Sequence, residues 1–513
     1  MGRIAIALVA AAAFSASPLM TSPAIPAPLH DSLGVFEAHA DIGASAHPGA
    51  ATYNAATQEY RLHAGGNVAP ERDTTHFAWR RMTGDFILQA RLDLAASSGH
   101  RKHRAGLMIR GGIDESTPYV GLAVHGDGRT ALELRRDKGG PITRLDLPVR
   151  NADALEIERR GDVYTIAVAR YGEPYTKHTL SDLPLTDAAQ VGLFLSASVS
   201  QPRIAAGFRN VRLIRPAKPD FVPYRDYIGS HLELLDVRTG ERQIVYSSSQ
   251  PFEAPNWTAD GTALIFNTSG ADPDTRGRLY RFDLATRQLQ LIDTGFAIRN
   301  NNDHVLSFDG KWLGISDQST DKGESTIYVL PTQGGTPRRV TTLTPSYLHG
   351  WSPDGRYLVY AGRRNGKFDI YKIRSDGSGE EVRLTDSPGV NDGPEFTPDG
   401  AFIYFNSVRT GKMQIWRMKP DGTQQERVTH DDFNDWFPHI APDGRSLVML
   451  SYGDDIDPAD HPYYKHVYLR LLPLDGGAPR VLAYVYGGQG TINVPSWSPD
   501  GTMIAFVSNS DTL

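Results

Sequence analysis

The segment His349–Ile373, HGWSPDGRYLVYAGRRNGKFDIYKI, decides the fold. Apolar and polar residues alternate along it, which predicts three short β-strands joined by a tight turn and a loop. The tight turn contains Asp354 and Gly355. This pair suits such a turn, because Gly accepts a positive φ and Asp bonds the backbone of its own turn. Three strands cannot bury an apolar face by themselves, so the segment is expected to stack against similar units.

Related segments recur at regular spacing. Asp-Gly stands in six alternating segments, with the aspartates at Asp260, Asp309, Asp354, Asp399, Asp443 and Asp500. The successive differences of 49, 45, 45, 44 and 57 residues suit a four-stranded propeller blade. A second kind of hairpin alternates with these segments and begins near His231. We therefore predict a six-bladed β-propeller over residues 231–513, whose sixth blade takes its outer strands from the start of the region and so closes the ring.

Two of the turns, Trp351–Gly355 and Trp497–Gly501, read WSPDG. They resemble the repeats of TolB-type six-bladed β-propellers, and the resemblance covers about residues 222–513. Similar blades occur in TolB-like periplasmic proteins, in oligogalacturonate lyases and in prolyl-oligopeptidase-type peptidases, so the resemblance implies a fold more than a function. The sequence contains no Gly-x-Ser-x-Gly elbow, which disfavours the peptidase class.

The region before the propeller lacks the repeat. Its short alternating strands predict an antiparallel β-sandwich over residues 29–215, followed by a Pro-rich linker at residues 216–230. The pattern Gly84–Asp93 (GDFILQARLD) followed by Ala105–Gly112 (AGLMIRGG) resembles concanavalin A-like domains found beside carbohydrate-active modules. The predicted fold class is all-β, with this sandwich before the six-bladed propeller.

The first 28 residues have the layout of a secretory signal peptide, with one Arg, an apolar run and then small residues. The apolar run Ile4–Ala13 is shorter than the ~20 residues of a membrane span. The chain has no cysteine, and its formal charge of -6 does not indicate nucleic-acid binding. We expect a bacterial protein that is periplasmic or secreted and does not span the membrane.

The loops that lead into the inner strands of the blades are rich in Asn, Asp and His, and they should open on one face of the ring. Carboxylates, amides, guanidinium groups and aromatic rings together suit a sugar ligand. Candidate catalytic residues are His349, Asp392 and Asp435. Candidate substrate-binding residues are Arg299, Asp303, Arg363, Asn391, Arg409, Trp436 and Asn493. A long loop adds His461, Tyr463 and Tyr464.

The resemblance to oligogalacturonate lyases implies a divalent metal at this mouth. By that resemblance the ligands would be His304, His349, His439 and Gln489, and the metal would acidify a proton next to a uronate carboxyl. Where those lyases carry histidines before the last inner strand, this chain reads GGQGTINVPSW, with Asn493 and no His. A metal-free alternative pairs Asp392 and Asp435 as general acid and base, with His349 assisting.

Two classes of function stay open. The first is a glycan-degrading enzyme, either a polysaccharide lyase or a glycoside hydrolase, that acts on an oligosaccharide or polysaccharide at the propeller mouth. The second is a non-catalytic TolB-like scaffold that binds an envelope protein or a glycan. In the sandwich, the acidic pair Glu156 and Glu158 is expected to lie on a solvated strand face and not to catalyse.

Overall fold

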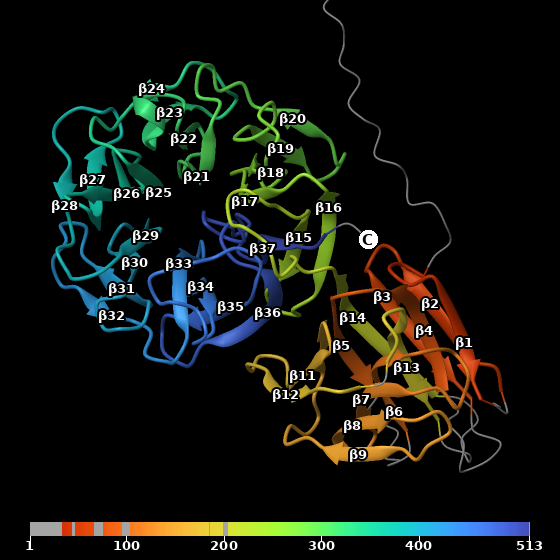
Figure 1. The fold of residues 1–513 in the computed structure, drawn as a ribbon. Coiled ribbons are helices and arrows are strands. Elements are labelled where there is room, and N and C mark those ends of the chain that lie inside the picture. The colour runs from red at the N-terminus through yellow and green to blue at the C-terminus, as the bar shows by residue number, and fades with distance from the viewer. Residues whose placement is uncertain are drawn as a thin grey trace, which may run out of the picture. The chain divides into compact units, whose positions relative to one another are not determined.

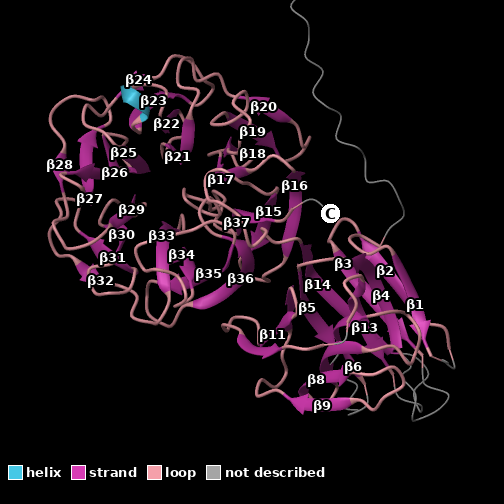
Figure 2. Ribbon diagram, in the orientation of Figure 1, coloured by secondary structure: helices cyan, strands magenta, loops and turns pink. Residues whose placement is uncertain are grey.

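The computed structural model describes residues 33–43, 47–65, 75–94, 103–183, 185–197 and 204–511. The signal peptide predicted at residues 1–28 lies outside these ranges. Strands make up nearly all the regular structure that is described, next to the short 3-10 helix η2 (Asp321–Gly323) (Figure 2). No helix in the described part is long and apolar enough to cross a membrane.

Two seven-stranded antiparallel sheets form the N-terminal part of the described chain. The first contains, in spatial order, β1 (Ala38–Ile42), β4 (Thr75–Met82), β13 (Ala189–Ser196), β6 (Arg104–Arg110), β7 (Tyr119–His125), β8 (Thr130–Arg135) and β9 (Thr143–Asp146). The second contains β12 (Thr176–Leu180), β11 (Val163–Ala169), β10 (Ala154–Arg160), β5 (Phe86–Leu94), β14 (Ile204–Ile214), β3 (Glu59–Ala64) and β2 (Ala50–Asn54).

One apolar core joins these two sheets. Leu107 and Leu193 of the first sheet and Leu88 and Ile157 of the second belong to one cluster and are 0% exposed. Each such side chain stabilises the fold by about 1.5–3 kcal/mol relative to an exposed one. The sheets therefore form one two-layer unit.

The repeat region forms six sheets arranged in a ring (Figure 1). Blades one to three are β17 (Phe252–Trp257), β18 (Ala263–Thr268), β19 (Leu279–Asp283), β20 (Leu289–Leu291); β21 (Asn300–Leu306), β22 (Trp312–Asp317), β23 (Thr326–Pro331), β24 (Arg338–Arg339); and β25 (Ser346–Trp351), β26 (Tyr357–Arg364), β27 (Lys367–Arg374), β28 (Val382–Arg383). Blades four and five are β29 (Asn391–Phe396), β30 (Ile403–Ser407), β31 (Gln414–Met418), β32 (Glu426–Arg427); and β33 (Asn434–Ile440), β34 (Ser446–Tyr452), β35 (Lys465–Pro473), β36 (Arg480–Gly487). Blade six combines β37 (Met503–Asn509) with β15 (Ser230–Asp236) and β16 (Arg242–Ser248).

The two WSPDG turns each hold an inner hairpin and link it to the preceding blade. The Ser352 hydroxyl donates to Asp354 Oδ1 at 2.6 Å, the Arg356 amide donates to the same oxygen at 3.0 Å, and Gly355 has a φ of 69°. Trp351 Nε1 donates to the Val305 carbonyl of the preceding blade at 2.9 Å. The repeated motif thus fixes both the turn and the contact between blades.

The ring closes as the order of the hairpins predicts. β15 pairs antiparallel with β37 over seven residue pairs, from Ser230 opposite Asn509 to Asp236 opposite Met503. The strand that opens the propeller and the strand that ends it therefore lie in one sheet. Six-bladed closure is confirmed, and it leaves no inner hairpin without its outer partner.

Glu233 is the charged centre of this closing blade. Its carboxylate accepts hydrogen bonds from Arg242 Nη2 at 2.7 Å, from Arg212 Nη2 at 2.6 Å and from the Ser508 hydroxyl at 2.5 Å. The residue is 0% exposed. Burial would raise the pKa of Glu233, but the two guanidinium groups outweigh it and hold the pKa well below its usual range. Since Arg212 lies on β14, this carboxylate binds the sandwich and both ends of the propeller together.

We predict that Glu233→Gln lowers the free energy of unfolding by about 3–5 kcal/mol, because it leaves two buried guanidinium groups without their counter-charge. Chemical denaturation measures this loss. Glu173→Gln is the matched control, because Glu173 pairs with Arg170 at an exposed site, where side-chain exposures are 47% and 61%. Equal unfolding curves for the two variants would contradict the role given to Glu233.

The acidic pair of the sandwich is not solvated, and that expectation is wrong. Glu156 is 1% exposed, because β35 of the propeller covers it. His466 of β35 places Nε2 3.1 Å from Glu158 Oε2 and Nδ1 3.7 Å from Glu156 Oε1. Burial would lower the pKa of His466, but the two carboxylates outweigh it and raise the pKa above its usual value. A protonated imidazole therefore joins the sandwich to the propeller.

We predict that this contact is lost as the pH rises. A raised pKa in the folded state means that the stabilisation is complete below the unfolded value of about 6.5 and disappears as the pH passes the folded pKa. The free energy of unfolding of the native chain should fall over that interval, and His466→Gln should lack this component. Denaturation midpoints from about pH 5 to about pH 9 measure it. The exposed His430→Gln is the control, and parallel pH profiles for all three proteins would contradict the prediction.

Candidate functional site

A cavity of about 590 Å³ opens among the innermost strands of the ring. β17, β21, β25 and β29 contribute Glu253, Asp303, His349 and Asp392 to its wall. The innermost strands of a propeller converge on its axis, so side chains that are distant in sequence face one space. Asn493, just before the last blade, also lines the cavity.

Asp303, His349 and Asp392 form a carboxylate–imidazole–carboxylate group. His349 Nε2 lies 3.1 Å from Asp392 Oδ1 and 3.9 Å from Asp303 Oδ1. The imidazole stacks on the Phe437 ring with centroids 5.9 Å apart, and the Gly393 amide donates to Asp392 Oδ1 at 2.8 Å. The side chains of Asp303 and His349 are only 8% and 5% exposed, so little solvent screens their charges.

The two carboxyl groups have different electrostatic environments. Burial raises the pKa of Asp303 to about 7, aided by the Asp392 and Glu253 charges and opposed by His349. For Asp392, burial is outweighed by the charge and hydrogen bond of His349, and its pKa is lowered. The pKa of His349 is raised, because both aspartates outweigh its burial. The imidazole of His349 therefore lies between one carboxylate whose pKa is lowered and one carboxyl that titrates near neutral pH.

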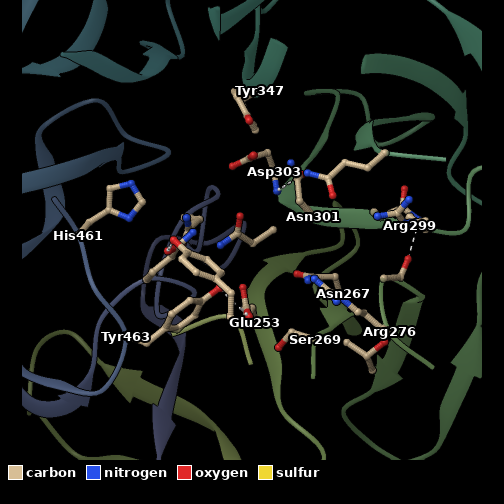
Figure 3. A pocket seen from close by; sticks show the side chains of 18 of the residues that line it. Glu253, Asn267, Ser269, Arg276, Arg299, Asn301, Asp303, Tyr347, His461 and Tyr463 are labelled. Carbon is tan, nitrogen blue, oxygen red and sulfur yellow. Dashed lines mark hydrogen bonds between the residues drawn. The ribbon is translucent and has the colours of Figure 1, made fainter. Parts of the chain in front are cut away.

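A second corner of the cavity combines tyrosines with Glu253. Tyr463 donates its hydroxyl to Glu253 Oε1 at 3.2 Å, and its ring meets Tyr224 edge to face with centroids 5.6 Å apart. Tyr224 donates to Gln489 Oε1 at 3.1 Å, and Tyr227 also lines the cavity. Figure 3 shows Tyr463 and His461 on one side of the cavity, with Arg276 and Arg299 on the other.

Eight residues singled out from the sequence line the cavity, although their roles stay predictions. They are Arg299, Asp303, His349, Asp392, His461, Tyr463, Gln489 and Asn493. All but His461 and Tyr463, which stand in the long loop, lie in an innermost strand or in the loop before it.

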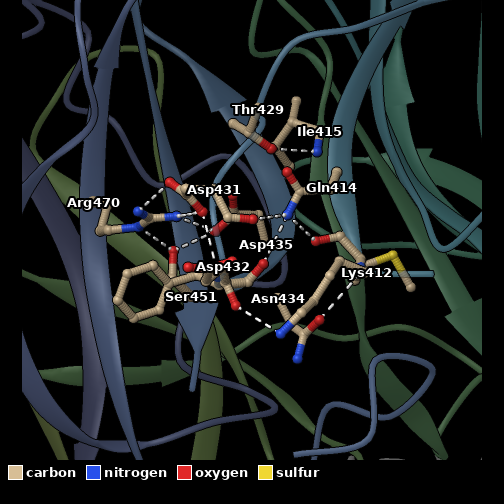
Figure 4. Close-up of polar contacts among 12 residues, drawn as sticks. Lys412, Gln414, Ile415, Thr429, Asp431, Asp432, Asn434, Asp435, Ser451 and Arg470 are labelled. Atoms are coloured by element: carbon tan, nitrogen blue, oxygen red, sulfur yellow. Dashed lines mark hydrogen bonds and ion pairs between the residues drawn. The ribbon is translucent and has the colours of Figure 1, made fainter. Parts of the chain in front are cut away.

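Asp435 does not face the cavity, so its pairing with Asp392 as acid and base is corrected. It accepts from Arg470 Nη2 at 2.5 Å and from the Ser451 hydroxyl at 2.7 Å within blade five (Figure 4). Asp431 accepts from the same guanidinium at 2.7 Å. Asp435 follows the loop as Asp392 does, and both inner strands contain a register shift, but Arg470 and Ser451 hold the Asp435 carboxylate inside its own blade.

Four proposed sugar contacts also lie elsewhere. Arg409 donates to Asn391 Oδ1 at 2.9 Å and places its guanidinium carbon 4.5 Å from the Trp416 ring centroid, so both polar residues serve the interior of blade four. Arg363 is exposed and lies over the Phe368 ring at 6.0 Å. Trp436 is 1% exposed and packs behind His461, with ring centroids 4.5 Å apart.

The proposed metal ligands do not come together. His439 Nδ1 pairs with Glu395 Oε2 at 2.7 Å, and Nε2 bonds the Ile492 carbonyl, so both ring nitrogens are occupied. His304 is 0% exposed, and burial lowers its pKa to about 3. Within the described ranges, one group of three His, Asp or Glu ligand atoms lies within 4.8 Å of one another. That group is Glu156, Glu158 and His466, outside the cavity. The implied set therefore does not fit a metal.

Sequence reasoning missed Glu253, Tyr224 and Tyr227. The two tyrosines stand in the stretch predicted as a linker. The Ile228 amide of that stretch donates to Tyr464 Oη at 3.2 Å and so connects it to the propeller. Nothing in the Pro-rich sequence of this stretch indicates that its tyrosines will line the cavity of the propeller. Glu253 stands in the first inner strand at the level of Asp303, and alignment of the loops was the signal that could have found it.

Comparison with known proteins assigns the propeller to a class. A family model described as the TolB beta propeller domain matches residues 349–512. The uncharacterized protein Atu1656 of Agrobacterium fabrum is 48% identical over 279 residues, which are 54% of this chain and 92% of that protein. A solved structure of a putative TolB from Agrobacterium tumefaciens is 46% identical with a TM-score of 0.52, covering 56% of this chain and 100% of that one.

The fold and the axial cavity thus define a six-bladed propeller with a polar pocket at its mouth. The chain belongs to the family of TolB-type β-propellers. A solved oligogalacturonate lyase in complex with manganese is 16% identical with a TM-score of 0.35, covering 53% of this chain and 71% of that one. This likeness is too distant to inform the site.

The coupling between His349 and Asp392 gives a prediction. In Asp392→Asn the main partner that raises the pKa of His349 is gone while the ring stays buried, so the pKa should fall. NMR titration of the His349 ring measures it. Asp386→Asn removes a 75% exposed carboxylate that pairs with Lys367, and it should leave the titration of His349 unchanged. An identical His349 titration in both variants would contradict the geometry described.

Proposed function

We propose that the chain is an exported carbohydrate-directed protein whose axial cavity binds an oligosaccharide and cleaves it. The observation that carries this proposal is the pair of carboxyl groups on either side of His349, whose pKa values are shifted in opposite directions. Environments that shift the pKa values of two carboxyl groups apart are typical of a general acid and a general base that work together.

The roles follow from the protonation states. Asp303, with a pKa of about 7, is protonated in a large fraction of molecules at neutral pH and can donate to the leaving oxygen of a glycosidic bond. Asp392 is ionised and accepts a proton, either from an attacking water or from the sugar carbon next to a uronate carboxyl. His349 stabilises the negative charge of Asp392. Both hydrolysis and elimination can use this arrangement.

The remaining wall suits a sugar. Asn301, Asn302 and Gln489 present amides for hydroxyl groups, and Tyr347 and Tyr463 present aromatic rings to C–H edges. The volume of about 590 Å³ lies within the usual range for small-molecule pockets. We assign the N-terminal sheets to a sandwich of concanavalin A type that gives the glycan a second contact, and we assign residues 1–28 to a signal peptide for a periplasmic or secreted protein.

The alternative is a non-catalytic scaffold that binds an envelope protein or glycan at the same mouth. The TolB-type family favours it, because the matching family model is described as a TolB propeller and the structure at 46% identity as a putative TolB. In that case the same carboxylates would bind a polar partner and no bond would be broken.

Incubation with a panel of acidic, neutral and amino oligosaccharides tests the proposal. New reducing ends indicate hydrolysis, and the ultraviolet absorbance of an unsaturated uronate indicates elimination. Asp303→Asn should slow turnover by about 100-fold or more, within the usual range for a general acid. The rate should fall as the pH rises above about 7, because Asp303 then loses its proton.

Asp386→Asn is the control and should turn over as the native chain does. Binding without any product across the panel would contradict catalysis and favour the scaffold. Turnover that survives in Asp303→Asn and Asp392→Asn would place the chemistry elsewhere.

A further inference from the structure

Glu253 is a buried carboxylate without a cationic partner. It is 7% exposed, and no Arg, Lys or His nitrogen of the described residues lies within 4.0 Å of its oxygens. The neutral Tyr463 hydroxyl donates to its Oε1 at 3.2 Å. Arg276 acts on it only from an exposed position across the cavity. Burial raises the pKa of Glu253, because a buried charge without a counter-charge is costly, so a positive group on a ligand would stabilise its ionised form.

The backbone holds Glu253 in this position. Ala254 donates its amide to the Gly490 carbonyl at 2.7 Å, and a Cβ on Gly490 would come within 2.6 Å of Glu253 Cγ. Gly490 also has a φ of +90°, which favours glycine. Glu253 lines the cavity in this position, and a side chain at residue 490 would collide with it.

A second acceptor lies beside it. Asn267 of β18 is the direct cross-strand neighbour of Glu253, and the Oδ1 of its side chain has no protein partner although the residue is only 2% exposed. Figure 3 shows both side chains on the same wall of the cavity. Side chains of directly paired residues lie about 5 Å apart, so one ligand group can reach both acceptors.

Tyrosine rings form the rest of this corner. Tyr463 and Tyr224 meet edge to face at 5.6 Å, and Tyr227 donates its hydroxyl to the Tyr224 carbonyl at 3.1 Å. The negative faces of such rings attract cations, and the carboxylate of Glu253 beside them adds a negative charge. Glu253, Asp303 and Asp392 give the cavity three carboxyl groups. The imidazoles of His349 and His461 also line it, and its two guanidinium groups, those of Arg276 and Arg299, belong to exposed residues.

We infer that the ligand of this cavity carries a protonated primary amine, held by Glu253, Asn267 and the tyrosine rings, and that the saccharide is therefore an amino sugar. This inference deepens the proposed function and rests on it. An ammonium group has three donors and no acceptor, which matches a carboxylate without a cationic partner and an amide oxygen without a protein partner, both beside aromatic faces. An N-acetyl group in the same place would bring no charge and a single N–H donor.

Calorimetric titration with a matched pair of ligands tests it. The probes are a β-1,4-linked glucosamine tetrasaccharide and the same tetrasaccharide fully N-acetylated, at a pH where the amine is protonated. The free amine should bind at least about tenfold more tightly, in line with a charge-assisted hydrogen bond. Glu253→Gln should abolish this difference in affinity, and Asn267→Ala should reduce it. Glu241→Gln, which removes a carboxylate that pairs with Arg209 outside the cavity, should leave it intact.

The outcomes separate the inference from the proposed function. If the N-acetylated or an acidic oligosaccharide binds as tightly as the free amine or more tightly, the assignment of an amino sugar is wrong. The proposal of a saccharide site then still stands. If a preference for the amine is unchanged in both Glu253→Gln and Asn267→Ala, the assigned residues are wrong. If no saccharide of either kind binds, both proposals fall.

Discussion

The pairing of β15 with β37 is the contact on which the rest of the propeller depends. A blade in this fold buries its faces only against its neighbours, and each neighbour needs the next one. Without that pairing the first and last blades would expose open sheet edges. The four inner strands that carry Glu253, Asp303, His349 and Asp392 would then no longer converge on one axis. The cavity is therefore a product of ring closure and not of any single blade.

Charge reinforces the closure where strands from distant parts of the chain meet. Glu233 binds guanidinium groups from β14 and β16 and a hydroxyl from β37, so one carboxylate connects three segments. Buried ion pairs add little net stability compared with apolar residues, but they tolerate few alternative partners. We regard this group as the device that selects the correct outer strands for blade six.

The repeats could be predicted from the sequence because the information is local. Asp-Gly and the alternating strands have a chemical reason that holds in every blade, and the Ser or Thr before the turn has one in all blades but the fifth, which has Ala441 there. The same alignment predicted that His349 and Asp392 lie together near the mouth of the propeller. Asp435 did not follow it, because Arg470 of β35 pairs with its carboxylate, and the alignment of the inner strands does not include that strand.

Other features had no local signal. The alternation of Glu156 and Glu158 resembles a solvated strand, and only the position of His466, more than 300 residues later in the chain, explains their burial. Tyr224 and Tyr227 stand in a stretch that reads as a spacer, yet it folds over the mouth and contributes aromatic faces to the cavity. Contacts between distant segments decide both cases, and such contacts cannot be inferred from a single sequence.

A crystal structure of the chain with a bound oligosaccharide tests the central claim most directly. The account predicts ligand density in the axial cavity, with a sugar ring between the Asp303–His349–Asp392 group and the Glu253 corner. Density confined to the N-terminal sheets, with the cavity holding only solvent, would contradict it.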